Sequence, residues 1–229
     1  MRFFILNNYS ELDGRVPQCD IDPNLDYNYS ANYSIWNIDY WKRINYAIRI
    51  PEFKLHHQAR WTDLINDVSF NRTTSLLAST KMWEVIRTFN LPEFQIFPCT
   101  VRKRDLKKDY LFIYFCEIHN QFIDFKKSTF FNTQYASIPP KDPELIQFSD
   151  AEAYKKEKDR LLGVSEIGYY EIHLIENIEL DLFRIFGFHN AMLISERLKI
   201  ALEENNITGF QTLPFESISI NKTYRKQEL

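Results

Sequence analysis

The feature that most constrains the fold of this chain is a stretch that occurs twice. Residues 76–99 and 192–215 align without a gap at one constant spacing. The identical positions include a serine, an asparagine and a proline, namely Ser79 and Ser195, Asn90 and Asn206, and Pro98 and Pro214. An ungapped match over the length of a helix and a strand indicates a duplicated structural unit. Two copies are too few for a solenoid, so we expect one globular body built from two related halves.

Each copy predicts a helix that begins after its serine. A serine at that point can accept a hydrogen bond from a free backbone N–H of the first helical turn. Apolar residues then recur at helical spacing, as Met82, Val85, Ile86 and Phe89 in the first copy and Leu198, Ala201 and Leu202 in the second. Pro92 is expected to end the first helix, and Asn205, Asn206 and Gly209 are expected to end the second. A short β-rich segment follows in both copies and is expected to end at Pro98 in the first and at Pro214 in the second. Each unit is therefore predicted to be helix, tight turn and strand.

The remaining elements predict an α+β protein with mixed or antiparallel sheets and helices packed on them. The apolar run 110–118 is expected to be a central strand buried on both faces. The basic segment 101–108 is expected to be a turn that leads into it. A highly charged helix is expected over residues 151–162, because a capping-box pattern precedes it.

Three prolines in residues 137–143 mark the expected boundary between the halves. We therefore expect a first half over about residues 1–136 and a second over about 144–218. The polar residues 219–229 are expected to form a tail.

Composition narrows the function classes. The 229 residues are 45% hydrophobic and 26% charged, as in an ordinary globular protein. The 19 Phe and 13 Tyr against 5 Gly indicate an aromatic core, and the sequence has no P-loop and no G-x-S-x-G motif. The net charge of −3 argues against a dedicated nucleic-acid binder and is compatible with docking a basic partner.

The expected location is the cytoplasm. The N-terminal apolar run is too short for a secretory signal, and no run approaches the ~20 apolar residues of a membrane span. Three widely spaced cysteines fit reduced, buried thiols better than disulfides. A membrane partner is therefore not expected.

Metal and cofactor sites are not expected either. Cys116 and His119 have C-x-x-H spacing, but a structural zinc site needs two more ligands, and only Cys19 and Cys99 are available as thiols. The adjacent His56 and His57 would point to opposite faces of a strand.

One candidate acid–base pair stands out. Glu171 and His173 would share a strand face by alternation, although a solvated sheet face explains them equally well. Ser79 and Ser195 are better explained as helix caps than as nucleophiles. We therefore assign no catalytic residue and expect a protein that is not an enzyme.

The C-terminal third resembles the signature of a bacterial immunity-protein family that neutralises polymorphic toxins. The similarity lies in an "LFR" segment, then "SERL", a helix and a "TGF" strand entry, and the residues that carry it are Phe183, Ser195, Glu196, Arg197, Leu198, Gly209 and Phe210. Residues 122–128 also resemble an Asp-x-x-x-Ser strand of that family, here Asp124 and Ser128. The resemblance covers about residues 74–216. It implies a non-enzymatic protein that binds a cognate toxin domain and blocks it.

A Tyr-rich segment is the candidate partner surface. Its aromatic residues are Tyr27, Tyr29, Tyr33 and Trp36, and tyrosine and tryptophan favour interfaces. The alternative interpretation is that these aromatic side chains cover the hydrophobic core. The alternative function is a small-molecule-binding protein or enzyme that uses a cleft between the two halves.

Overall fold

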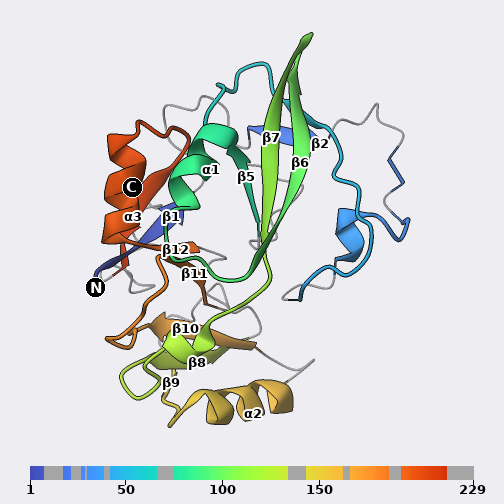
Figure 1. Ribbon diagram of the computed structural model, residues 1–229. Coiled ribbons are helices and arrows are strands. Elements are labelled where there is room, and N and C mark those ends of the chain that lie inside the picture. Colours follow the sequence, from blue (N-terminus) through green and yellow to red (C-terminus); the bar gives the residue numbers. More distant parts are fainter. Residues whose placement is uncertain are drawn as a thin grey trace.

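The structure is a computed structural model of residues 1–229. It describes residues 1–7, 18–21, 27–28, 30–38, 42–65, 75–133, 143–161, 166–185 and 192–215. Within these ranges the chain forms three sheets and three α-helices (Figure 1), which confirms the predicted α+β class with mixed and antiparallel sheets.

The largest sheet has six strands in the order β2-β3-β6-β7-β5-β4. Their bounds are β2 (Cys19–Ile21), β3 (Phe53–Leu55), β6 (Phe94–Lys103), β7 (Leu106–Phe115), β5 (Ser75–Ser79) and β4 (Leu64–Ile65). β3 and β6 are parallel, and the other pairs are antiparallel. The central position of β7 and the burial of its second half confirm the expected central strand.

The strand after the first helix is longer than expected. Pro98 was predicted to end it, but β6 continues through Pro98 to Lys103. Among the described residues, β3 pairs with β6 only at Val101 and Arg102. Because β3 does not reach Pro98, the missing N–H of this proline removes no hydrogen bond between β3 and β6.

The second sheet brings the two ends of the described chain together. Its antiparallel order is β11 (Leu182–Arg184), β12 (Met192–Ser195), β1 (Phe3–Asn7) and β13 (Gln211–Pro214). The N-terminal strand therefore lies between two strands of the C-terminal region (Figure 1). The expected half over residues 1–136 is wrong on this point, because β1 completes the sheet of the other half.

The third sheet has the order β10 (Glu166–Glu171), β8 (Thr129–Thr133) and β9 (Leu145–Ile146). Helix α2 (Ala151–Leu161) lies beside this sheet and confirms the predicted charged helix. The core of this part is aromatic, with the rings of Phe130, Tyr154 and Tyr169 in mutual contact. Since β8 and β9 pair across the expected boundary at 137–143, that boundary does not separate two sheets.

The two matching segments adopt the same sequence of elements. In each, a strand ends at the serine and a helix begins, α1 (Thr80–Ile86) after β5 and α3 (Glu196–Glu204) after β12. The strands that precede the helices were not predicted. One buried cluster contains matching residues of both units, namely Met82, Ile86, Leu198 and Leu202. Both units thus have the predicted helix, turn and strand, while their origin by duplication stays a prediction.

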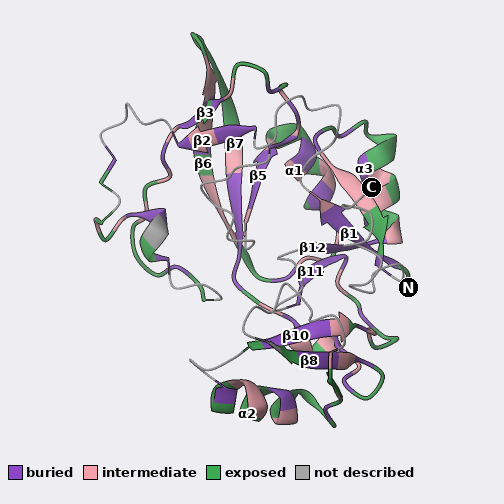
Figure 2. Cartoon of the chain, turned by 180° about the vertical axis from the view of Figure 1, so that it is seen from behind, coloured by how far each residue is buried: buried purple, intermediate pink, exposed green. Residues whose placement is uncertain are grey.

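Figure 2 shows buried residues along β1, β5 and β12 and exposed residues on the outer side of α3.

Candidate functional site

The two units meet at a pair of matching polar clusters, each built around an aspartate and the serine that begins a helix. The Ser195 hydroxyl donates to Asp181 Oδ1 at 2.6 Å and accepts a hydrogen bond from the N–H three residues later at 3.2 Å. The Ser79 hydroxyl donates to Asp63 Oδ1 at 2.8 Å and accepts from the corresponding N–H at 3.1 Å. Both serines are therefore N-caps, as predicted, and their hydroxyls are fully used within the scaffold.

A cation at the matching position of each helix completes the cluster. Arg197 donates to both carboxylate oxygens of Asp181, with Nη2 at 2.5 Å from Oδ2. Lys81 Nζ lies 3.8 Å from Asp63 Oδ2. Burial raises the pKa of Asp181, but the hydrogen bonds from Arg197, Ser195 and the Asn90 N–H outweigh burial and lower it. Asp181 is therefore held as a buried carboxylate.

The turn after each helix binds the aspartate of the other unit. The Asn90 N–H donates to Asp181 Oδ2 at 2.9 Å, and the Asp181 N–H donates to the Asn90 carbonyl at 2.8 Å. On the other side, the N–H and hydroxyl of Thr208 donate to Asp63 Oδ2 at 3.0 and 2.8 Å. The Asp63 N–H in turn donates to the Thr208 hydroxyl at 3.0 Å. Each aspartate thus joins the serine of one unit to the turn of the other, and we call each set a latch: Asp181 with Ser195 and Asn90, and Asp63 with Ser79 and Thr208.

The residues that carry the resemblance lie in or beside the two latches. Phe183 is fully buried, with its ring edge-on to Phe3 at 5.1 Å. Gly209 has a φ of +89°, and a Cβ there would stand 2.0 Å from the Leu64 carbonyl oxygen. Leu198 is fully buried, and Phe210 packs against the same cluster. These residues therefore build the scaffold.

The second segment of the resemblance is a turn, which corrects the expectation of a strand. The N–H and hydroxyl of Ser128 both donate to the Asp124 carbonyl, at 2.9 and 2.8 Å. The turn forms because the serine hydroxyl satisfies a backbone acceptor locally. β8 begins only after it, at Thr129.

The candidate acid–base pair is brought together. His173 Nε2 lies 3.2 Å from Glu171 Oε1, and their side chains are 42% and 51% exposed. The His173 backbone is held by Ser128, whose hydroxyl accepts from its N–H at 3.0 Å. The pair is open to solvent, where an ion pair of this kind stabilises a fold by at most about 1 kcal/mol.

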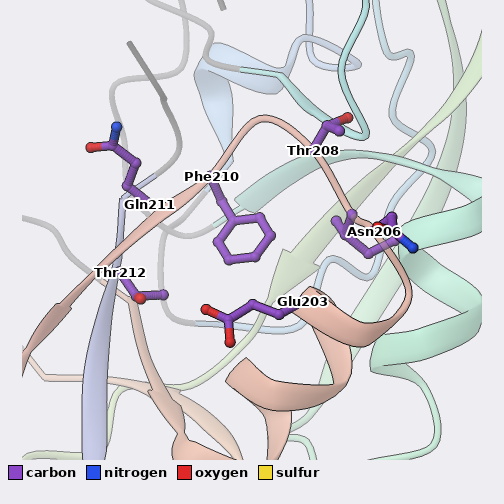
Figure 3. A pocket seen from close by; sticks show the side chains of 7 residues that line it. Glu203, Asn206, Thr208, Phe210, Gln211 and Thr212 are labelled. Carbon is purple, nitrogen blue, oxygen red and sulfur yellow. The ribbon is translucent and has the colours of Figure 1, made fainter. Parts of the chain in front are cut away.

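A depression with a volume of about 400 Å³ lies between the end of α3 and β13 (Figure 3). Its lining residues are Glu203, Asn206, Ile207, Thr208, Phe210, Gln211 and Thr212. All of them belong to the second unit, so this depression is not the cleft between halves that the alternative function requires. The Glu203 carboxylate that faces it is paired with Lys199 at 2.8 Å.

The C-x-x-H residues do not face a common centre with further ligands. The Cys116 thiol is buried, which together with the nearby Glu93 carboxylate raises its pKa to about 11. His119 is 5% exposed, and burial lowers its pKa although Glu117, 3.4 Å away, opposes this. In the described ranges no group of three or more His, Cys, Asp or Glu residues is placed to hold a metal ion.

The Tyr-rich segment is only partly available as a surface. Tyr27 is 6% exposed, and its hydroxyl accepts from the Ile35 N–H at 2.9 Å and donates to the Arg49 carbonyl at 3.1 Å. Tyr27 therefore holds this segment together from inside, which corrects its assignment as an anchor. Tyr33 is partly exposed and packs edge-on against Tyr27.

The other two aromatic residues of this segment cannot be placed as anchors. Tyr29 lies outside the described residues. Trp36 is in a 3-10 helix (Ile35–Asn37), and its side chain is outside the described part.

Comparison with protein-family models gives no match, and comparison with curated proteins gives none. No helix among the described residues is long and apolar enough to cross a membrane.

Proposed function

We propose that this protein is a cytoplasmic immunity protein that binds a cognate toxin domain and neutralises it without catalysis. The proposal starts from the resemblance of the C-terminal segment to a bacterial immunity family. The observation that carries it is the use of the Ser195 hydroxyl, which caps α3 and binds the buried Asp181. The serine of the "SERL" segment thus serves the scaffold, as expected where the resembling residues maintain a fold and the surface selects the partner.

The latch between the units supports the same proposal. A binding protein gains affinity when its surface is already ordered, because less conformational entropy is lost on association. Asp181 and Asp63 each fix a turn of one unit against the other through several hydrogen bonds. The surface carried by these turns is therefore held in one arrangement before any partner arrives.

The enzyme alternative has one observation in its favour, the contact between Glu171 and His173. General acid–base catalysis requires such a pair to face a bound substrate. The pair is about half exposed, and the depression described above is lined by other residues. The immunity proposal is therefore preferred.

The test is co-expression with C-terminal toxin domains encoded beside this protein. The expected result is that cells survive the toxin domain only when this protein is present, and that the two co-purify in a stoichiometric complex. A matched control is Glu171→Gln, which should protect as well as the wild type. Failure to protect against any adjacent toxin, with a small metabolite retained by the purified protein, would overturn the proposal in favour of the alternative.

A further inference from the structure

The most prominent projection of the molecule is the end of the β6–β7 hairpin (Figure 1). β5 pairs with β7 only as far as Tyr110, so the preceding residues of β7 extend past the end of β5. β6 and β7 remain paired up to Lys103 and Leu106, and the turn residue Arg104 has a φ of +55°. We define the hairpin tip as residues 102–109. Figure 2 shows that this end is exposed.

The charge of the hairpin tip opposes that of the whole chain. The tip contains five cations, Arg102, Lys103, Arg104, Lys107 and Lys108, against the two anions Asp105 and Asp109. The chain as a whole has a net charge of −3. A local surplus of one sign steers a partner of the other sign towards it.

The tip is also held rigidly by the segment beside it. Glu52 accepts from Arg102 Nε at 3.0 Å and from Lys107 Nζ at 2.7 Å. Lys103 Nζ donates to the Ala59 carbonyl at 2.6 Å, and Lys108 Nζ lies 4.7 Å above the Trp61 ring. These contacts span both strands of the hairpin, so the tip is ordered in advance of binding.

An apolar side chain stands in the middle of these charges. Leu106 is 66% exposed, the highest value among the large hydrophobic residues that the structure describes. A lone exposed leucine needs no explanation on a flat surface, but here it stands on a rigid projection with a charged rim. That combination, an apolar centre within a polar rim, is the anatomy of a protein-binding hot spot.

We propose that the hairpin tip is a docking element that places Leu106 in an apolar pocket on an acidic surface of a partner protein. The identity of that partner as a toxin domain rests on the proposed function. A nucleic acid fits less well, because the exposed Leu106 at the centre of the tip would find no apolar pocket among phosphates. The exposed carboxylates Asp105 and Asp109 would also repel phosphates, whereas a protein can offer them donors.

The test is site-specific photo-crosslinking in the cells that make this protein, with p-benzoylphenylalanine in place of Leu106. The control carries the same probe in place of Leu145, which is 48% exposed on β9. The expected result is one crosslinked protein with an acidic surface, found with the probe at position 106 and not at position 145. No crosslink at position 106, or an equal one at both positions, would overturn the inference.

Affinity measurements with the purified partner complete the test. Leu106→Ala and Arg104→Glu should each weaken binding at least about tenfold, whereas Leu145→Ala should leave it within about twofold. Thermal unfolding should be unchanged in all three, since these side chains are exposed. Wild-type affinity in both tip variants would overturn the inference. It would also be overturned if the protein bound duplex DNA or anionic vesicles through the hairpin tip and did not bind the partner.

The two proposals fail separately. If the partner crosslinked at position 106 is acidic but is not a toxin, the docking element stands and the immunity function falls. If a toxin domain binds the wild type and both tip variants equally well, the immunity function stands and the docking element falls.

Discussion

Asn90 and Asp181, which are 91 residues apart in the chain, exchange two hydrogen bonds: the Asn90 N–H donates to the Asp181 carboxylate, and the Asp181 N–H donates to the Asn90 carbonyl. The turn after α1 is thereby fixed to the residue that precedes β11. In the opposite direction, the Thr208 N–H donates to the Asp63 carboxylate, and the Asp63 N–H donates to the Thr208 hydroxyl. The body is held together by this exchange as well as by its apolar core.

Removal of the Asp181 carboxylate should destabilise the protein strongly. Asp181→Ala leaves the Ser195 hydroxyl and the Asn90 N–H without their acceptor, and Asp181 is fully buried. We expect a loss of about 3 kcal/mol in the free energy of unfolding. Urea denaturation followed by circular dichroism measures it.

The matched control is Asp63→Ala at the other latch. The Asp63 side chain is 15% exposed, so water can replace part of what it provides. The loss should be smaller, about 1–2 kcal/mol. The free energy of unfolding could instead fall equally in both variants, or fall by less than about 1 kcal/mol in Asp181→Ala. Either result would show that the difference in burial does not set the strength of the latches.

The Asp181 latch should also make stability depend on pH at the acid end. Its pKa in the folded state is lowered below the ordinary value of 3.8 by its hydrogen bonds, so the folded protein binds this proton less readily than the unfolded chain. The stabilisation is present above pH 3.8 and is lost as the pH falls through the folded-state pKa. Unfolding measured from pH 7 down to pH 2.5 should show a steeper loss for the wild type than for Asp181→Asn. Parallel curves for the two proteins would contradict this.

Gly209 should tolerate no side chain. Gly209→Ala combines a positive φ with a Cβ that would stand 2.0 Å from a backbone oxygen of Leu64, so the turn must move away from β4. We expect a loss of at least about 2–3 kcal/mol, measured by thermal or urea unfolding. Asn206→Gly, at a φ of +50° three residues earlier in the same loop, is the control and should change stability by less than about 0.5 kcal/mol. Equal effects would show that strain at Gly209 does not arise from the contact with Leu64.

The Glu171 and His173 pair should prove dispensable for binding and for stability. His173→Gln should change the free energy of unfolding by less than about 1 kcal/mol, because both side chains are about half exposed. Partner affinity measured by calorimetry should equal that of the wild type. A loss of partner or metabolite binding in this variant, with its fold intact, would instead favour the ligand-binding alternative.

Local signals explain what the sequence predicted correctly. Ser79 and Ser195 were identified as caps because a cap is decided within three residues, and both hydroxyls accept the expected N–H. α2 was found from its capping pattern, and β7 from its apolar run. Each of these elements is specified by its own residues.

What escaped prediction depends on contacts between distant segments. The Asn90 and Asp181 exchange has no local signature, because an asparagine in a turn and an aspartate before a strand are ordinary in themselves. Tyr27 was offered as a surface anchor because composition does not reveal whether a phenol finds its partners inside, as this one does. The end of β6 was predicted wrongly at Pro98, because the sequence does not show that one side of β6 is unpaired at this residue.

The place of β1 determines the order in which the body can assemble. Phe3 and its neighbours are synthesised before their strand partners β12 and β13, which come after residue 191. β1 therefore stays without both of its partner strands until translation has passed Pro214. A nascent chain stalled before that point presents an unpaired β1 to chaperones, and the four-stranded sheet closes only once β13 has been made.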